Sequence, residues 1–388
     1  MKVITSKISK RIVNKINKNY NILFYDSDNL YPQHILDICH GSGITESCQE
    51  LHRDFMFGDG FEKNGDVVIN RLYDTELNKL LYHTIDDYSY FNGFAIHVNY
   101  NANFKIHSLT RLQFSNTRLG IPDDYDRVGK IAYYNNWDRK YGKQVKKNMI
   151  SYVDTFNPDP DVIAYQVKSA GGWKNYKGQI LWYSKDGDYV YPRSPFDPVL
   201  EDIETDSKIK TYKYRSVVNG FSAGHLLIWR GKFESAKAEQ DFEDNLNKFQ
   251  GEENAGSIFL VQLDYDEQKP EIEKFEQFNT DKLFQYTEKS IQDNIRKRKK
   301  IPPVLIGDLT VGRLGTAEEI FDATVLFNAF TGAERKFFEK VFTKLMKLYK
   351  RPVKQDLKIK KLSIIEDGDI EKRKKLKETE KTTTAIEE

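Results

Sequence analysis

The chain has 388 residues, of which 39% are apolar, so it can bury one large core or two or three smaller ones. Its basic and acidic residues nearly balance at a net charge of +2, which excludes a basic surface over the whole protein and limits any contact with nucleic acid to local sites. No apolar run approaches the ~18 residues that a membrane-spanning helix needs, so we expect a soluble protein.

The N-terminal stretch is basic. Met1 to Lys18 carries six basic and no acidic residues, with an isoleucine at every fourth position from Ile4 to Ile16. We interpret residues 1–19 as an arm that packs on a neighbouring subunit or stays solvated, with a helix on a membrane surface as the alternative. The two cysteines, Cys39 and Cys48, lack the spacing of a metal site and are expected to be buried thiols of a reducing compartment.

The first half of the chain predicts an α+β domain. Helical patterns cover residues 35–51 and 70–91, with a double-glycine turn at residues 58–60 between them. From Asn92 the apolar period changes to two, as in strands. An antiparallel sheet is expected, with strands around residues 94–100, 105–114, 130–137, 162–168 and 179–190.

A proline-rich connector begins near Tyr191. In it, Asp197 is the predicted N-cap and Pro198 the first position of a charged helix over residues 199–218. An apolar strand follows as His225, Leu226, Leu227, Ile228, Trp229 and Arg230. A second helix runs from Ser235 to the closing Gly251. Because an isolated helical hairpin with so narrow an apolar stripe is hardly stable, this one should pack against copies of itself.

Residues 258–263 form another apolar strand pattern, and a charged helix pattern comes after it. The helix buries one face, marked by Phe284, Ile291 and Ile295, and the pair Pro302-Pro303 forbids its continuation. Its end is strongly basic, with Arg296, Lys297, Arg298, Lys299 and Lys300. These side chains are candidates for contact with phosphate groups, the alternative being a solvated helix end that complements the helix dipole.

A glycine-containing loop follows this helix. Its members are Asp308, Leu309, Thr310, Val311, Gly312, Arg313, Leu314 and Gly315. Thr316 and Glu319 then match a capping box, which predicts that the next helix opens there. An amphipathic stripe covers residues 338–349, and residues 366–388 have the composition of a charged, partly disordered tail.

Catalytic motifs are missing from the sequence. It has no phosphate-binding P-loop, no dinucleotide-binding glycine motif, no nucleophile elbow and no zinc-protease motif. The seven histidines do not pair at metal-ligand spacing, and the acidic pairs Asp86-Asp87 and Asp123-Asp124 are better explained as solvated turns than as Mg²⁺ ligands. We therefore expect no enzymatic activity, no metal and no cofactor.

The order of these features resembles the portal proteins of tailed bacteriophages and prophages, the head–tail connector family. In that family a wing leads into a stem helix, a small clip, a second stem helix, a return to the wing, a helix, a tunnel loop and a further helix, with a crown at the C-terminus. The helix-ending motif of the family is similar to Ile301-Pro302-Pro303-Val304-Leu305-Ile306-Gly307. The resemblance covers most of residues 20–350 and rests on the order of the motifs.

The resemblance implies an α+β portal fold with an α/β wing, a helical stem, a small clip and a short helical crown, assembled as a ring. It divides the chain into a basic arm (1–19), a first part of the wing (20–197), a stem helix (198–220), a clip (221–234), a second stem helix (235–250), a wing return with the tunnel loop 308–315 (251–331), a short crown helix (332–350) and a charged tail (351–388).

The implied function is a ring, in the family a dodecamer, at one capsid vertex through which double-stranded DNA is packaged and ejected. The loop from Asp308 to Gly315 would line the channel, with Arg313 pointing into it, while His225 to Arg230 and Lys232 would face terminase and adaptors. Implied partners are further copies of the chain, DNA without sequence specificity, the terminase large subunit, head–tail adaptors and major capsid or scaffold proteins, with no membrane. Implied locations are the virion and, during assembly, the host cytoplasm.

The competing interpretation is a monomeric nucleic-acid-binding or nuclease-like protein that uses the basic residues 296–300 and nearby acids. A weaker one is a membrane-surface protein that uses Met1 to Lys18. The mass of the particle in solution separates the first from a ring, and liposome binding tests the second.

Overall fold

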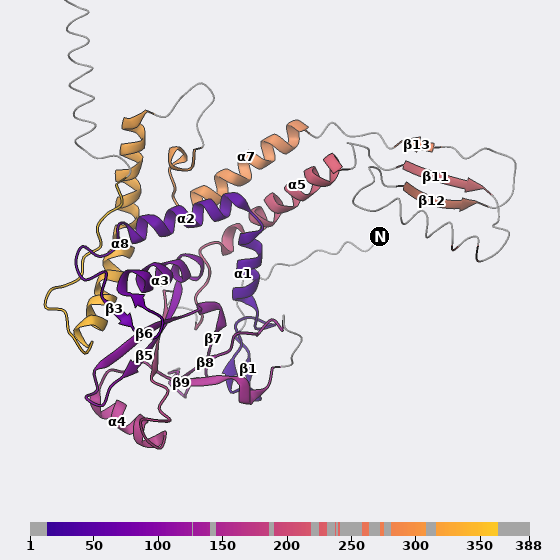
Figure 1. The fold of residues 1–388 in the computed structure, drawn as a ribbon. Helices are drawn as coiled ribbons and strands as arrows, with labels where there is room; N and C mark the ends of the chain where they lie inside the picture. The colour runs from indigo at the N-terminus through magenta and orange to yellow at the C-terminus, as the bar shows by residue number, and fades with distance from the viewer. Residues whose placement is uncertain are drawn as a thin grey trace, which may run out of the picture. The chain divides into compact units, whose positions relative to one another are not determined.

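The computed structural model describes residues 14–125, 127–139, 145–185, 190–218, 225–230, 237, 240, 258–263, 272–274, 281–307 and 316–363 (Figure 1). The chain divides into two compact units, each described by itself: unit 1 is Met1–Leu200 with Ile295–Glu388, and unit 2 is Glu201–Asn294. Several predictions fall outside the described residues and stay predictions; they concern most of the basic arm, most of the second stem helix, Lys232, the loop 308–315 and the tail from residue 364.

Unit 1 is built on a six-stranded sheet in the order β6-β5-β10-β9-β8-β7. The strands are β5 (Gly93–Tyr100), β6 (Ile106–Leu112), β7 (Thr117–Leu119), β8 (Lys130–Tyr133), β9 (Ser151–Thr155) and β10 (Gln179–Ser184). Neighbouring strands are antiparallel except β9 and β10, which run parallel. The predicted antiparallel sheet is confirmed apart from this pair, and the fold is mixed α and β. Two small sheets accompany it, β1 (Ile16–Asn17) with β2 (Ile22–Leu23) and β3 (Val68–Asn70) with β4 (Thr75–Glu76).

Three helices precede the inner strand β5, which lies second from one edge of the sheet. They are α1 (Tyr31–His40), α2 (Gly43–Phe57) and α3 (Leu77–Phe91). Asn92 ends α3 in the left-handed region at φ 56°, which asparagine tolerates. At Gly93 a Cβ would come within 2.8 Å of the carbonyl oxygen of Tyr183, so only glycine lets β5 start against β10 at this point. The polypeptide therefore turns directly from helix into the centre of the sheet. Cys39 and Cys48 are buried and free, as predicted.

One predicted strand is a helix. Residues 162–168 lie in α4 (Pro160–Ser169), whose N-cap Asp159 accepts a hydrogen bond from the Asp161 amide at 2.9 Å. A capping aspartate followed by proline at the first position is a helix start signal, and Ile163 and Val167 are buried four residues apart, as one helical face requires. The prediction failed because the apolar positions of so short a segment suit either period.

The C-terminal helix α8 (Ala317–Lys347) is continuous over 31 residues. The crown helix predicted over residues 332–350 largely coincides with the second half of this helix, because Gly332 lies inside it and does not break it; the division into domains stays a prediction. The second half of α8 packs in the main core rather than apart from it: Phe338 lies 5.7 Å from the Phe94 ring of β5 and 5.2 Å from the Tyr88 ring of α3.

The segment after α8 also belongs to unit 1. Leu357 and Ile359 are buried, and Ile359 forms a β-bridge with Phe61. The Lys360 amide donates to the carbonyl oxygen of Gly60 at 2.9 Å. The charged tail expected from residue 351 is therefore packed on the body as far as Ser363, where its described part ends.

Unit 2 holds most of α5 (Leu200–Val218) and α7 (Asp281–Arg298), together with a three-stranded sheet. An ion pair of 2.6 Å between Lys213 and Glu288 links the two helices. Asp197, predicted as the N-cap of the first helix, lies in the 3-10 turn η3 (Asp197–Val199), and its carboxylate binds the Tyr31 hydroxyl and Arg193 instead.

Within the described residues, no helix combines the length and apolar content that crossing a membrane requires.

The sheet of unit 2 differs from the expected clip. Strand β11 (His225–Arg230) pairs in parallel with β12 (Ile258–Leu263) and antiparallel with β13 (Ile272–Lys274). Residues 258–263 were expected to return to the wing, but their six-residue parallel register with β11 places them in one sheet with the clip strand. Parallel strands need a long crossover connection between them, and residues 231–257 provide that length.

Replacement of Phe338 with alanine should destabilise unit 1, because the fully buried ring contacts both α3 and β5. The expected loss in the free energy of unfolding is about 3–5 kcal/mol, measured by denaturant unfolding. Phe330→Ala on the same helix is the matched control, since its ring is 47% exposed and should change stability by well under half as much. Equal losses for the two variants would contradict the described packing of α8.

Candidate nucleic-acid interface and its anchor

The five basic residues at the end of α7 do not form one surface. Arg296 and Lys299 are 8% and 6% exposed, because residues three apart share a helical face and this face is buried. The exposed members are Lys297, Arg298 and Lys300. The predicted phosphate contacts are corrected for Arg296 and Lys299, whose side chains bind inside the protein, and stay a prediction for the other three.

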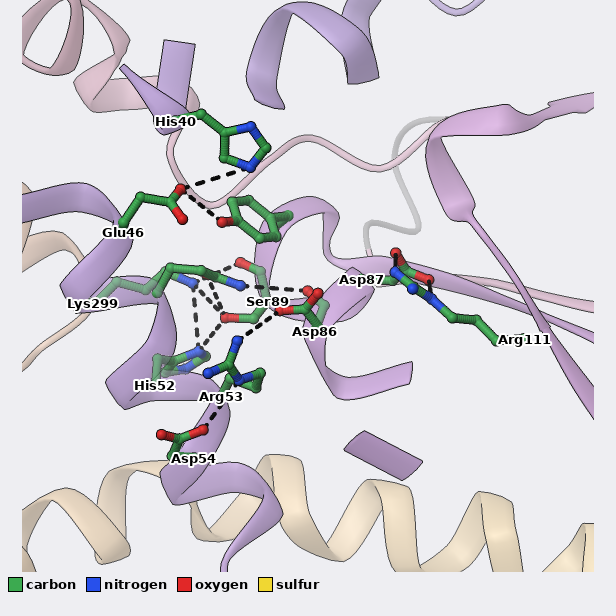
Figure 2. Close-up of polar contacts among 12 residues, drawn as sticks. His40, Glu46, His52, Arg53, Asp54, Asp86, Asp87, Ser89, Arg111 and Lys299 are labelled. Carbon is green, nitrogen blue, oxygen red and sulfur yellow. Dashed lines mark hydrogen bonds and ion pairs between the residues drawn. The ribbon is translucent and has the colours of Figure 1, made fainter. Parts of the chain in front are cut away.

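The amine of Lys299 is bound inside unit 1 (Figure 2). Its Nζ donates hydrogen bonds to the carbonyl oxygen of Ser89 at 2.7 Å and to the Ser89 hydroxyl at 3.1 Å, and it lies 3.4 Å from Nδ1 of His52. The Phe196 ring lies 4.6 Å away on another side. Burial lowers the pKa of Lys299 to about 7, although the charge of Glu334 acts in the opposite direction. The amine is therefore close to the balance between its charged and neutral forms at neutral pH.

Glu334 of α8 completes this group. Its Oε2 lies 3.2 Å from Nε2 of His52, and its Oε1 lies 3.0 Å from Nζ of Lys185. Burial alone would raise the pKa of Glu334, but the hydrogen bond with His52 and the charge of Lys185 lower it to about 2. Burial and the charge of Lys299 lower the pKa of His52 to about 4. We call the side chains of Lys299, His52, Ser89 and Glu334 the Lys299 cluster. It joins α2, α3 and α8 to the end of α7.

The cluster contains the residue types of a hydrolase catalytic triad, in which a serine, a histidine and an acid are linked by hydrogen bonds. Here they are Ser89, His52 and Glu334. Oγ of Ser89 lies 2.7 Å from Nδ1 of His52 and 2.8 Å from Oε1 of Gln49. However, Ser89 is only 1% exposed, and its hydroxyl accepts the hydrogen bond of Lys299. A nucleophile needs access to its substrate, so the arrangement supports a structural role: it holds the helices together.

The acidic pair of α3 is bound by arginines (Figure 2). Arg111 donates to both oxygens of Asp87, at 2.8 and 3.0 Å, and Nη1 of Arg53 lies 3.5 Å from Oδ1 of Asp86. Burial raises the pKa of Asp87 to about 6, while Arg111 acts to lower it. In the part of the chain that the structure describes, no group of three or more His, Cys, Asp or Glu side chains could hold a metal ion. The pair is a structural ion-pair site rather than a solvated turn.

A pocket of about 190 Å³ opens beside the Lys299 cluster. Its lining carries four cations against the carboxylate of Glu334, namely Lys185, Arg298, Lys299 and Lys300. An excess of positive side chains suits a small anion such as a phosphate group. The pocket is therefore where the exposed end of the basic run could meet phosphate.

Both ends of the loop 308–315 are anchored. Before the loop, Nη1 of Arg296 donates to the carbonyl oxygen of Ile301 at 3.1 Å, and the 3-10 turn η4 (Pro303–Ile306) ends at Gly307 in the left-handed region, φ 75°. After the loop, the Thr316 hydroxyl accepts from the Glu319 amide at 3.1 Å and the Glu319 carboxylate accepts from the Thr316 amide at 3.2 Å. The predicted capping box is confirmed, while the loop and Arg313 lie outside the described residues.

The predicted terminase-facing residues lie on one strand. His225, Leu226, Leu227, Ile228, Trp229 and Arg230 form β11, and the strand prediction is confirmed, while Lys232 lies outside the described residues. β11 lies between β12 and β13 in the sheet order. Its backbone is paired with β12 over all six residues and with β13 over residues 225–227.

The sequence did not predict the Lys299 cluster, because the residues of the cluster lie far apart in the chain. One signal could have found it. Lys299 follows Ile291 and Ile295 at intervals of four residues, and both isoleucines are buried, so Lys299 continues the apolar face of α7. A lysine on a buried face predicts a specific partner for its amine.

No family model and no curated protein matches the chain. Among solved structures, the virion of a native gene transfer agent particle gives a TM-score of 0.49 at 12% identity, over 89% of this chain and 87% of that one. The neck of such a particle, computed with C12 symmetry, gives 0.48 at 12% identity, over 89% and 88%. An HK97-family phage portal protein from Corynebacterium diphtheriae gives 0.40 at 10% identity, over 76% and 83%.

One of these solved structures carries the name of the family that the order of the sequence motifs resembles. At these identities and TM-scores the matches carry no argument about this chain, and its function has to be argued from its own features.

Lys299→Met should change how stability depends on pH. The unfolded lysine binds a proton up to about pH 10.4, whereas the folded one loses it near pH 7, so the unfolded state binds more protons in between and wild-type stability rises with pH there. From pH 7 to 9 we expect the free energy of unfolding of the wild type to rise by about 2 kcal/mol relative to Lys299→Met, measured by denaturant unfolding.

The matched control is Lys300→Met, which removes the exposed neighbouring lysine and should follow the wild-type pH profile. Parallel profiles for the wild type and Lys299→Met would show that the amine keeps its proton when folded.

Proposed function

We propose that the chain is a portal protein, which forms a ring at one capsid vertex and lets double-stranded DNA pass during packaging and ejection. One observation supports this most directly. The chain leaves unit 1 through α5, forms a separate unit with its own sheet, and returns through α7 to a proline stop, a short loop with two anchored ends and a long helix. In the resembling family a stem helix, a clip, a second stem helix and a return to the wing likewise lead to a helix, a tunnel loop and a further helix. Most of the proposed second stem helix, 235–250, lies outside the described residues.

Assembly into a ring is supported by the exposed tyrosines of α5, the proposed first stem helix, and of α7, the helix before the tunnel loop. Tyr212 and Tyr214 of α5 are 54% and 69% exposed, and Tyr286 of α7 is 77% exposed. Tyrosine is enriched at protein interfaces, and a repeated heterologous contact closes into a ring when its rotation allows. We propose twelve copies, as in the resembling family.

The loop from Asp308 to Gly315 is proposed to line the channel. Its two anchored ends support a defined position in each subunit, and Arg313 is the only charged side chain between Asp308 and Glu318. A nearly balanced overall charge suits sliding, because strong phosphate binding by many subunits would arrest DNA. Lys297, Arg298 and Lys300 add a local phosphate contact, without a role for the two buried members of the run.

The remaining assignments follow the same proposal. Residues 20–197 form the first part of the wing, 198–220 and 235–250 the stem, 221–234 together with β12 the clip, and the rest of 251–331, with the loop, the wing return. The sheet with β11 and Lys232 docks the terminase large subunit and later the head–tail adaptor, and the outer surface meets major capsid or scaffold proteins. The protein acts in the virion, after assembly in the host cytoplasm, as a structural component without catalysis.

Particle mass tests the proposal. Mass photometry and negative-stain electron microscopy of the purified full chain should show a ring of about twelve times the chain mass of 45.4 kDa. A chain that stays a monomer or dimer at micromolar concentration, with or without DNA, would overturn the portal assignment and favour the monomeric nucleic-acid-binding protein.

Arg313→Ala should reduce packaging efficiency or DNA retention several-fold while rings still assemble, because it removes the charge proposed to face the passage. Arg313→Lys is the matched control and should retain most of the function, since it keeps the charge. The measurements are protected DNA per particle and ring formation by microscopy. Normal packaging and retention in Arg313→Ala would show that the charge of Arg313 does not contribute to the passage of DNA.

A further inference from the structure

A second concave site lies far along α8 from the Lys299 cluster. It has a volume of about 660 Å³ and is formed by the second half of α8, the segment after it and Pro158. Five lysines line it, Lys336, Lys340, Lys344 and Lys347 of α8 together with Lys358. Leu348 and the buried Leu357 provide apolar wall. We call this site the lysine groove.

The lysines of α8 follow the helical period. Intervals of four, four and three residues place them on one face, with a rise of about 6 Å between lysines four apart. All four are exposed, whereas Phe338, Phe342 and Leu345 on the opposite face are buried in the core. The helix therefore presents a continuous row of amines along the groove.

The charge of the groove is unbalanced. Lys347 pairs with Asp356 at 2.7 Å, and Lys358 pairs with Glu339 at 3.4 Å. Glu339 is engaged a second time, because its Oε1 accepts the Ile359 amide at 2.9 Å. Among the described residues, Lys336, Lys340 and Lys344 have no ion pair. Three uncompensated amines along an apolar groove would be stabilised by carboxylates carried on a partly apolar segment.

We propose that the lysine groove binds the acidic segment of the same chain that follows Ser363. This segment carries four carboxylates and three isoleucines within a short stretch: Ile364, Ile365, Glu366, Asp367, Gly368, Asp369, Ile370 and Glu371. The carboxylates can form ion pairs with the lysines that have none, and the isoleucines can pack against Leu348 and Leu357. Duplex DNA matches the groove less well. Its phosphates would pair with the lysines, but it is stiff and would leave the apolar wall of the groove without a partner.

The segment is within reach. Nδ2 of Asn328 on α8 donates to the carbonyl oxygen of Leu362 at 2.9 Å, which fixes where the segment starts. Lys336 lies eight residues further along the helix, or about 12 Å, and Lys344 about 24 Å. Residues 357–362 run antiparallel to α8, since the Leu357 amide donates to Thr343 and the Leu362 carbonyl accepts from Asn328, so the segment has to turn back to enter the groove. An extended chain advances about 3.3 Å per residue, so the nine residues from Leu362 to Glu371 span up to about 30 Å, which leaves length for this turn.

Cross-linking tests the proposal in the full chain. Lys340→Cys with Asp369→Cys, treated with a short bismaleimide, should cross-link at least tenfold faster than the control pair Lys79→Cys with Asp369→Cys, in which the first position is exposed on α3. Cys39 and Cys48 are fully buried and should not react. The mass of the product separates binding within one chain from binding between copies.

Charge reversal supplies the second arm. Adding Lys336→Glu and Lys344→Glu to the groove pair, or raising the salt to 1 M, should lower the cross-linking rate several-fold, because the attraction is electrostatic and partly exposed. Equal rates for the groove and control pairs would overturn the proposal, and so would rates indifferent to charge reversal. Either result would leave the groove to another polyanion, such as DNA. Neither arm depends on the portal function.

Discussion

The buried amine of Lys299 is the constraint on which the arrangement of unit 1 depends. Removing a charged or polar group from water is expensive unless its hydrogen bonds are replaced, and here the Ser89 carbonyl and hydroxyl replace them. The amine can occupy this place only if α7 ends where it does and if α2, α3 and α8 supply their side chains together. A site that needs several elements at once fixes their relative positions more narrowly than apolar packing, which tolerates small displacements.

The same constraint acts on the loop that follows. From Lys299 the chain has only the Pro302-Pro303 stop and the turn η4 before Gly307, and the capping box at Thr316 defines the far end. Fixed ends restrict the conformations available to the residues between them.

The sequence predicted elements wherever the local signal agreed with the final environment. Residues 281–298 form the expected helix because their apolar positions keep one period over the whole length, and Thr316 opens α8 because a capping box is satisfied within one turn. The sequence could not predict α8 as one helix, since an interior glycine weakens a helix by about 1 kcal/mol and only packing shows that the weakness is tolerated. It also could not predict that β12 joins β11, because strand pairing across a long connection has no local signal. The Lys299 cluster could not be predicted for the same reason, because the burial of this lysine depends on helices that lie far from it in the sequence.

The core of unit 1 is discontinuous in the chain, and this has a consequence for biosynthesis. Phe94 and Tyr183 lie on neighbouring strands near Phe338, which is translated much later. At about 5–20 residues per second, synthesis from Tyr183 to Phe338 takes on the order of 10–30 s. During that interval the aromatic residues of these strands lack the helix that covers them in the folded chain, while unit 2 is translated in between. Folding in the cell therefore depends on keeping these residues from other nascent chains until α8 leaves the ribosome.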